Sequence, residues 1–202
     1  LTAELKQEIQ HNKADILAFL KAAKTQAVSA EEIPALSPDS PKLLSFAQQR
    51  LWLLAQLQGS SAAYNMPIAL QLNGNLNIDA LHSSLAYLLN RHESLRMYFP
   101  TVAGEPQIAF LNLDEIEVLT VQDCREEAGE KFLQCPNIQD LIDAHAQEYF
   151  DLNIGLLFKA KLLQLQDQKS VLVINMHHII SDGWSMGVFV RELRQAYTAY
   201  SQ

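Results

Sequence analysis

Two imidazoles and a carboxylate stand close together near the end of the chain, as His177, His178 and Asp182. The apolar run before them, residues 171–174, is rich in β-branched side chains and predicts a buried strand. After them, apolar residues recur every three or four positions from Met186 to Tyr200, which predicts an amphipathic helix. A strand end that leads into a helix is a frequent place for catalytic groups.

Strand geometry predicts different roles for the two histidines. Successive side chains of a strand point to opposite faces, so His178 shares a face with Met176 if the strand persists that far, while His177 points the other way. Only one of the two imidazoles can then reach a given cavity.

These residues are compatible with four kinds of site. Two histidines and a carboxylate could bind zinc, although adjacent strand residues point apart and make shared coordination awkward. The G-x-S-x-G pattern at residues 183–187 suggests a serine hydrolase. In that fold the acid and the histidine of the triad follow the serine in the sequence, but no Asp or His follows Asp182 here. The histidines could instead be structural, with Asp182 capping the next helix. In acyl transfer, the fourth alternative, an imidazole polarises or deprotonates a nucleophile while the acid in the next turn fixes the geometry.

The bulk composition limits the class of protein. Of 202 residues, 49% are hydrophobic and 19% are charged, which is enough for one well-buried core and an appendage. The formal net charge of -8 comes without a Lys/Arg cluster, which argues against a nucleic-acid partner. The sequence shows neither a charged-then-apolar leader nor a membrane-length apolar run, so we expect no membrane association and a cytoplasmic location.

The elements that must position these residues predict an α+β domain. Apolar residues at helical spacing in 1–24 predict one or two helices, and the prolines of 25–42 predict an extended linker. Further helices are expected over 43–57, 78–89 (capped by Asn77) and 137–150, and strands near 68–72, 95–99, 107–111, 117–121 and 156–166. This mixed order predicts helices packed on a sheet, with no internal repeat.

Three segments resemble core motifs of the condensation domains of nonribosomal peptide synthetases. Residues 177–185, HHIISDGWS, resemble the HHxxxDG signature, residues 45–52, SFAQQRLW, resemble the first core motif, and residues 91–99, RHESLRMYF, resemble the second. Residues 64–67 and 150–152 are also similar to family segments, so the likeness spans about 43–202. One departure is Leu156, where the family pattern has a proline after the glycine.

The resemblance implies a chloramphenicol-acetyltransferase-like fold, a mixed sheet with packed helices. In the complete domain, two similar lobes enclose the active site in a tunnel between them. The chain carries only the motifs of the N-terminal lobe, so we expect residues 43–202 to be one lobe, inactive alone. Residues 1–24 are similar to the terminal helices of a tubulysin-type N-terminal docking domain, joined by the linker at 25–42.

By resemblance, the reaction is amide formation between two carrier-bound thioesters, in which the acceptor's amine attacks the donor's aminoacyl or peptidyl thioester. His178 is then the catalytic residue, as base, orienting group or oxyanion stabiliser, and His177 is structural. Asp182 is expected to pair with Arg91, and Gly183 to give backbone room beside the tunnel.

The resemblance also implies partners in place of bound cofactors. Both substrates are carried on the phosphopantetheine of upstream donor and downstream acceptor peptidyl carrier domains, an adenylation domain lies downstream, and no metal is bound. Residues 181–185 are most similar to the subtype that joins an L-configured donor to an L-configured acceptor. The alternatives are an epimerisation domain, a starter acyltransferase and a non-catalytic module that recruits carriers.

Overall fold

The structure, a computed structural model, describes residues 42–58, 61–125 and 136–202, together with residues 7, 10–15, 17, 18, 37 and 40. The chain divides into two compact units, Leu1–Pro41 and Lys42–Gln202. In the first unit, the described residues between 7 and 18 are helical except for a turn at Asn12. The remaining residues of the predicted docking helices, and most of the predicted linker, lie outside the described residues.

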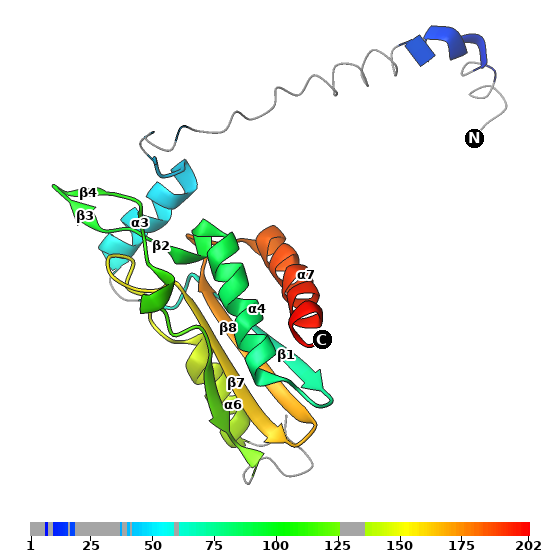
Figure 1. Cartoon of the computed structure of the whole chain (residues 1–202). Coiled ribbons are helices and arrows are strands. Elements are labelled where there is room, and N and C mark those ends of the chain that lie inside the picture. Colours follow the sequence, from blue (N-terminus) through cyan, green and yellow to red (C-terminus); the bar gives the residue numbers. More distant parts are fainter. Residues whose placement is uncertain are drawn as a thin grey trace. The chain divides into compact units, whose positions relative to one another are not determined.

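The second unit is an α+β domain built on a mixed four-stranded sheet (Figure 1). Strands β1 (Asn65–Asn73), β8 (Lys169–His177), β7 (Phe158–Gln166) and β6 (Thr120–Asp123) lie in that order. β6 runs parallel to β7, and the other neighbours are antiparallel. Two small ladders pair β2 (Met97–Tyr98) with β5 (Ala109–Phe110) and β3 (Thr101–Val102) with β4 (Glu105–Pro106). The helices are α3 (Phe46–Gln58), α4 (Ile78–Arg91), α6 (Pro136–Ala146) and α7 (Gly183–Tyr200), with 3-10 turns at Glu93–Arg96 and Leu113–Glu115.

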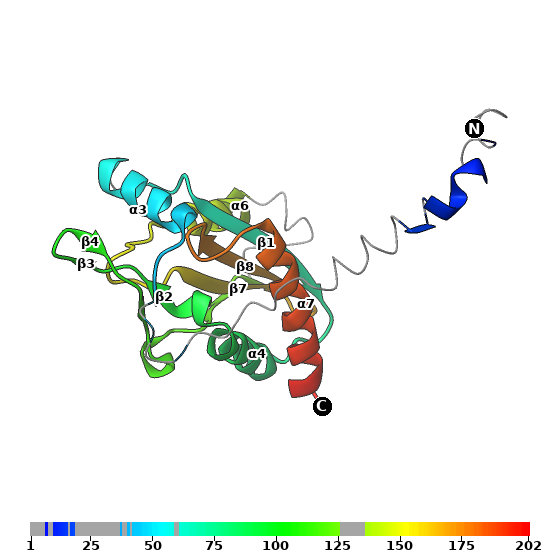
Figure 2. The same cartoon turned by 90° about the horizontal axis from the view of Figure 1, so that it is seen from above.

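Alternation along β7 and β8 gives the sheet two apolar faces, and helices cover both (Figure 2). One face packs against α4 and α7 through Phe158, Leu162, Leu172, Ile174 and Met176. The opposite face packs against α6 through Leu163, Leu165, Val171 and Val173. Because β8 is buried on both faces, its sequence is a nearly continuous apolar run, as expected for a central strand.

Most predicted elements are confirmed, with shifted boundaries. Asn77 caps α4, since its Oδ1 accepts the N–H of Ala80 at 3.0 Å. The strand predicted at 95–99 is partly wrong: residues 93–96 form a 3-10 turn, and the Arg96 side chain donates to the carbonyls of Leu89 and Leu111. The helix predicted at 137–150 ends earlier, at Ala146.

The early end of α6 has a physical cause in the sheet. The amide nitrogen of Asn65 donates to the carbonyl of Ala146 at 2.7 Å, and that of Asn175 donates to the carbonyl of His145 at 2.8 Å. These strand side chains satisfy carbonyls that a helix end leaves without intrahelical partners. They therefore fix the C-terminus of α6 against β1 and β8.

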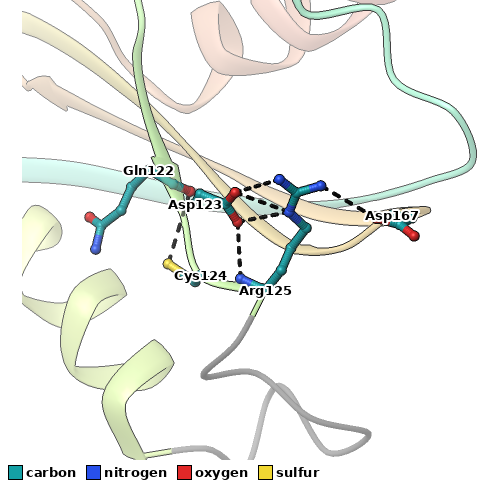
Figure 3. Close-up of polar contacts among 5 residues, drawn as sticks. All are labelled: Gln122, Asp123, Cys124, Arg125 and Asp167. Atoms are coloured by element: carbon teal, nitrogen blue, oxygen red, sulfur yellow. Dashed lines mark hydrogen bonds and ion pairs between the residues drawn. The ribbon is translucent and has the colours of Figure 1, made fainter.

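Arg125 forms ion pairs near the turn between β7 and β8 (Figure 3). This turn precedes β8, whereas His177 is the last residue of that strand. Arg125 donates to Asp123 at the end of β6, and its Nη1 lies 3.4 Å from Asp167 in the turn between β7 and β8. The hydrogen bond and charge of Arg125 lower the pKa of Asp123. This contact joins the edge strand to the central hairpin.

Candidate active site

The segment from His177 to Gly183 is a tight connection between β8 and α7. β8 ends at His177, and residues 178–180 form a turn in which the N–H of Ile180 donates to the carbonyl of His177 at 3.1 Å. The N–H of His178 donates to the carbonyl of Tyr64 at 2.8 Å. The strand therefore stops one residue before His178, so strand alternation, on which we based the separation of the two histidines, does not extend that far.

His177 is enclosed in the core. The residue is 3% exposed, and the centroid of its ring lies 6.2 Å from that of Tyr64 and 6.3 Å from that of Phe150. Its Nδ1 accepts the N–H of Ile179 at 3.1 Å. Burial, with a smaller contribution from the neighbouring His178, lowers the pKa of His177 to about 4. His177 is thus a neutral residue that holds the turn.

His178 is exposed, in contrast to the buried residues on either side of it. Its Nδ1 lies 2.8 Å from the carbonyl oxygen of Ser181. A carbonyl can only accept, so in the neutral ring Nδ1 carries the proton and Nε2 carries the lone pair. This contact fixes both the tautomer and the orientation of the imidazole.

A cavity of about 660 Å³ lies beside this imidazole. Its walls come from α3, from Tyr64, from the connection after β8, including His178 and Asp182, and from Ser185 in the first turn of α7. Nε2 is the ring nitrogen left to interact with a molecule in this cavity. The first core motif, on α3, and the HHxxxDG motif are thereby brought to one site although more than a hundred residues separate them.

Asp182 caps α7, and the prediction that it forms an ion pair with Arg91 is wrong. Its Oδ1 accepts the N–H of Ser185 at 2.8 Å, and hydrogen bonds from Ser185 lower its pKa. Arg91 Nε instead lies 3.3 Å from Oε2 of Glu192, which also contacts His92 Nε2 at 2.7 Å. The physical reason is distance along α7: Glu192 lies about 15 Å beyond Asp182 at the rise of an α-helix.

Gly183 is the first residue of α7 and is exposed. A Cβ built at this position meets no atom within 4 Å. The backbone room that we expected Gly183 to provide is therefore not required by any described part of this chain.

One further residue, Gln48 on α3, contributes to the site although its sequence context did not predict it. Its Nε2 donates to the carbonyl of Ile179 at 3.3 Å. The S-x-x-Q pattern from Ser45 to Gln48 signals a helix start, but it contains no information about a contact with a segment so distant in the sequence.

Neither a metal-binding group of side chains nor a membrane-spanning helix is found among the residues that the structure describes. Residues 42–58, 61–125 and 136–202 contain no group of three or more His, Cys, Asp or Glu side chains that could hold a metal ion. Among the described helices, none has the length and apolar character needed to cross a bilayer.

Comparison with known proteins identifies the family. Residues 41–202 match the model of the condensation domain. The chain is 43% identical over 187 residues to malpinin synthetase from Mortierella alpina, and 35% identical over 196 residues to bacitracin synthase 2 from Bacillus licheniformis. These matches cover 91% and 95% of this chain, but only 2% and 7% of the two synthetases, so the chain spans a small part of the relatives that it matches.

Solved structures show the same fold. The first condensation domain of the calcium-dependent antibiotic synthetase, in complex with a substrate analogue, is 25% identical with a TM-score of 0.70, and the match covers 81% of this chain and 38% of that one. The starter condensation domain of rhizomide synthetase RzmA is 22% identical with a TM-score of 0.70, covering 80% and 38%. The X-domain solved with OxyB from teicoplanin biosynthesis is 29% identical with a TM-score of 0.71, covering 83% and 34%. On its motifs, its fold and these relatives, the chain belongs to the condensation-domain family of nonribosomal peptide synthetases.

Proposed function

We propose that this domain forms amide bonds between two carrier-bound thioesters, with His178 as its catalytic residue. The observation that carries the proposal is the geometry of the imidazole: it is exposed beside a cavity, and its Nδ1 is held by the carbonyl of Ser181. The lone pair on Nε2 is then placed to orient the acceptor's amine or to take up its proton.

The chemical demand on the protein is modest. The amine nitrogen attacks the thioester carbonyl, the C–N bond forms, the C–S bond breaks, and the proton lost by the amine converts the departing thiolate into a thiol. An α-amine titrates near pH 8, so part of it is already neutral at physiological pH, and positioning of two tethered reactants supplies much of the acceleration. A positioned imidazole then adds about 10² to 10⁴-fold.

The substrates and partners follow from this proposal. Donor and acceptor arrive on the phosphopantetheine of two carrier domains, with an adenylation domain downstream in the same synthetase. The domain itself binds neither a cofactor nor a metal. The sequence of residues 181–185, S-D-G-W-S, supports the subtype that joins an L-configured donor to an L-configured acceptor. Residues 1–24 would contribute helices of a docking domain, ahead of the linker at 25–42 and the lobe at 43–202.

A second candidate function is recruitment without catalysis. It is favoured by the likeness to the X-domain, a structure solved in complex with a partner protein. In that case the surface of the domain binds carriers or accessory proteins, and His178 is dispensable. The two candidates differ in their dependence on this one side chain.

The test measures single-turnover amide formation with loaded donor and acceptor carriers, using the intact domain that carries this chain. We expect His178→Ala to lower the rate by about 10² to 10⁴-fold with an unchanged melting temperature. His82→Ala provides a matched control, because His82 is an exposed histidine on α4 that does not line the cavity. Near-normal turnover by His178→Ala would exclude the catalytic assignment and favour recruitment.

A further inference from the structure

One side chain, that of Gln48, connects the start of α3 to the turn that carries His178. Its Oε1 accepts the N–H of Ser45 at 3.0 Å, and its own N–H donates to Oγ of Ser45 at 3.2 Å. This reciprocal pair is a capping box at the beginning of the helix. Nε2 of the same amide reaches across to the carbonyl of Ile179.

The orientation of this amide follows from its partners. If the oxygen and nitrogen were exchanged, Oε1 would face the carbonyl oxygen of Ile179 and the amide NH₂ would face the N–H of Ser45. An acceptor would then face an acceptor at Ile179, and a donor would face a donor at Ser45. The network therefore assigns Nε2 to Ile179, and makes Gln48 a donor to the turn.

The bond matters because of what surrounds Ile179. The backbone N–H of His178 donates to the carbonyl of Tyr64. The next backbone N–H, that of Ile179, donates to Nδ1 of His177. The carbonyl of Ile179 is the next polar group along the backbone, and Gln48 takes it. The backbone on both sides of the imidazole is thus fixed, and the bond from Gln48 comes from a different element, α3.

We propose that Gln48 is a positioning residue for His178, coupling the start of α3 to the catalytic turn; this rests on the proposed function above. Gln48 acts through the backbone of Ile179, so its loss leaves the imidazole in place but less well aimed. Loss of Gln48 should therefore lower the reaction rate of the bound complex and leave the carrier concentration needed for half-saturation unchanged.

The chain offers a matched pair of substitutions. Gln48→Glu keeps the acceptor that completes the capping box, because Glu serves there as well as Gln, but removes the donor to Ile179. Gln49→Glu makes the same change one residue later, where the amide donates to the carbonyl of Leu44 on an exposed surface. Gln48→Met removes the donor without adding charge.

We expect Gln48→Glu and Gln48→Met to lower the limiting single-turnover rate of the intact domain by about tenfold, the factor expected for one lost hydrogen bond. Gln49→Glu should stay within about twofold of the wild type. Melting temperatures of Gln48→Glu and Gln49→Glu should agree, since both retain the capping box.

The pH dependence gives a readout that a merely structural role would not produce. A protonated glutamic acid again carries an O–H donor, so the rate of Gln48→Glu relative to wild type should recover as the pH falls through the titration of this group. Gln48→Met has no titratable group that could regain a donor, so its rate relative to the wild type should show no such recovery.

The outcomes separate the two proposals. Equal rates for Gln48→Glu and Gln49→Glu, in a domain that is active and loses activity with His178→Ala, overturn the positioning role alone. A rate loss seen in Gln48→Glu but not in Gln48→Met shows that charge, not the lost donor, is responsible, and also overturns it. An active His178→Ala overturns the proposed function itself.

Discussion

Two neighbouring histidines differ because of a single turn in the backbone. His177 ends β8 and is enclosed by aromatic rings, whereas His178 begins the turn and is exposed beside the cavity. Burial makes the charged form of His177 costly and favours the neutral ring that accepts the N–H of Ile179. The two imidazoles therefore differ in access to the cavity: His178 lines it, whereas His177 is buried in the core.

The lowered pKa of His177 predicts a loss of stability in acid. Between pH 6.5 and pH 4 the unfolded chain binds a proton that the folded chain does not, so the free energy of unfolding decreases as the pH falls through this window. The full contribution, about 3 kcal/mol, is present above pH 6.5.

The measurement compares urea unfolding of the wild type and His177→Asn across this window. Asn retains an acceptor for the N–H of Ile179 and does not titrate. The difference in the free energy of unfolding between the two proteins should change by roughly 3 kcal/mol between pH 7 and pH 4. A pH-independent difference would show that the His177 ring is not held neutral by the fold.

At the scale of elements, the start and the middle of α7 make different polar contacts. Its first turn is capped by Asp182, and its middle is joined to the end of α4 by the contacts of Glu192 with Arg91 and His92. The acidic side chain that contacts Arg91 is thus on α7 itself, not in the turn that carries His178. The hydrogen bond and charge of His92, with help from Arg91, lower the pKa of Glu192.

Double-mutant cycles should show which acidic side chain is coupled to Arg91. Arg91 and Glu192 should show a coupling energy of a few tenths to about 1 kcal/mol, because the Arg91 side chain is half exposed and solvent screens the pair. Arg91 and Asp182 should show additive effects on the free energy of unfolding. A sizeable coupling between Arg91 and Asp182 would restore the pairing that the sequence suggested.

At the scale of the second unit, the sheet brings the motifs together but leaves part of its surface apolar. β1 and β8 pair in a register that sets Asn65 opposite His177, so that Tyr64 lies beside the turn that carries His178. Large apolar residues are exposed on α3 and at the start of α7, two elements that contribute other residues to the cavity wall: Phe46 is 91% exposed, Leu57 73% and Trp184 85%. The elements that form the cavity beside His178 therefore also carry exposed apolar surface.

This exposed apolar surface predicts that the 202-residue chain by itself does not catalyse condensation. Positioning of two tethered substrates requires a closed site, and an exposed imidazole without one contributes little. The check is carrier-dependent amide formation by the chain, measured beside the intact domain under identical loading. Comparable single-turnover rates for the two would contradict this prediction.

Local signals along the chain were enough to predict the elements and the chemical groups of the site. The apolar runs of β7 and β8, the Asn77 cap and the periodicity of α7 are such signals, and the H-H-x-x-x-D-G wording identified the turn that carries His178. Which side chains meet became known only from the folded chain: Arg91 with Glu192, Asp182 with its own helix, and Gln48 with Ile179. The physical reason is that capping and periodicity act within a few residues, whereas the partner of a side chain depends on strand register and helix packing, which bring distant segments into contact.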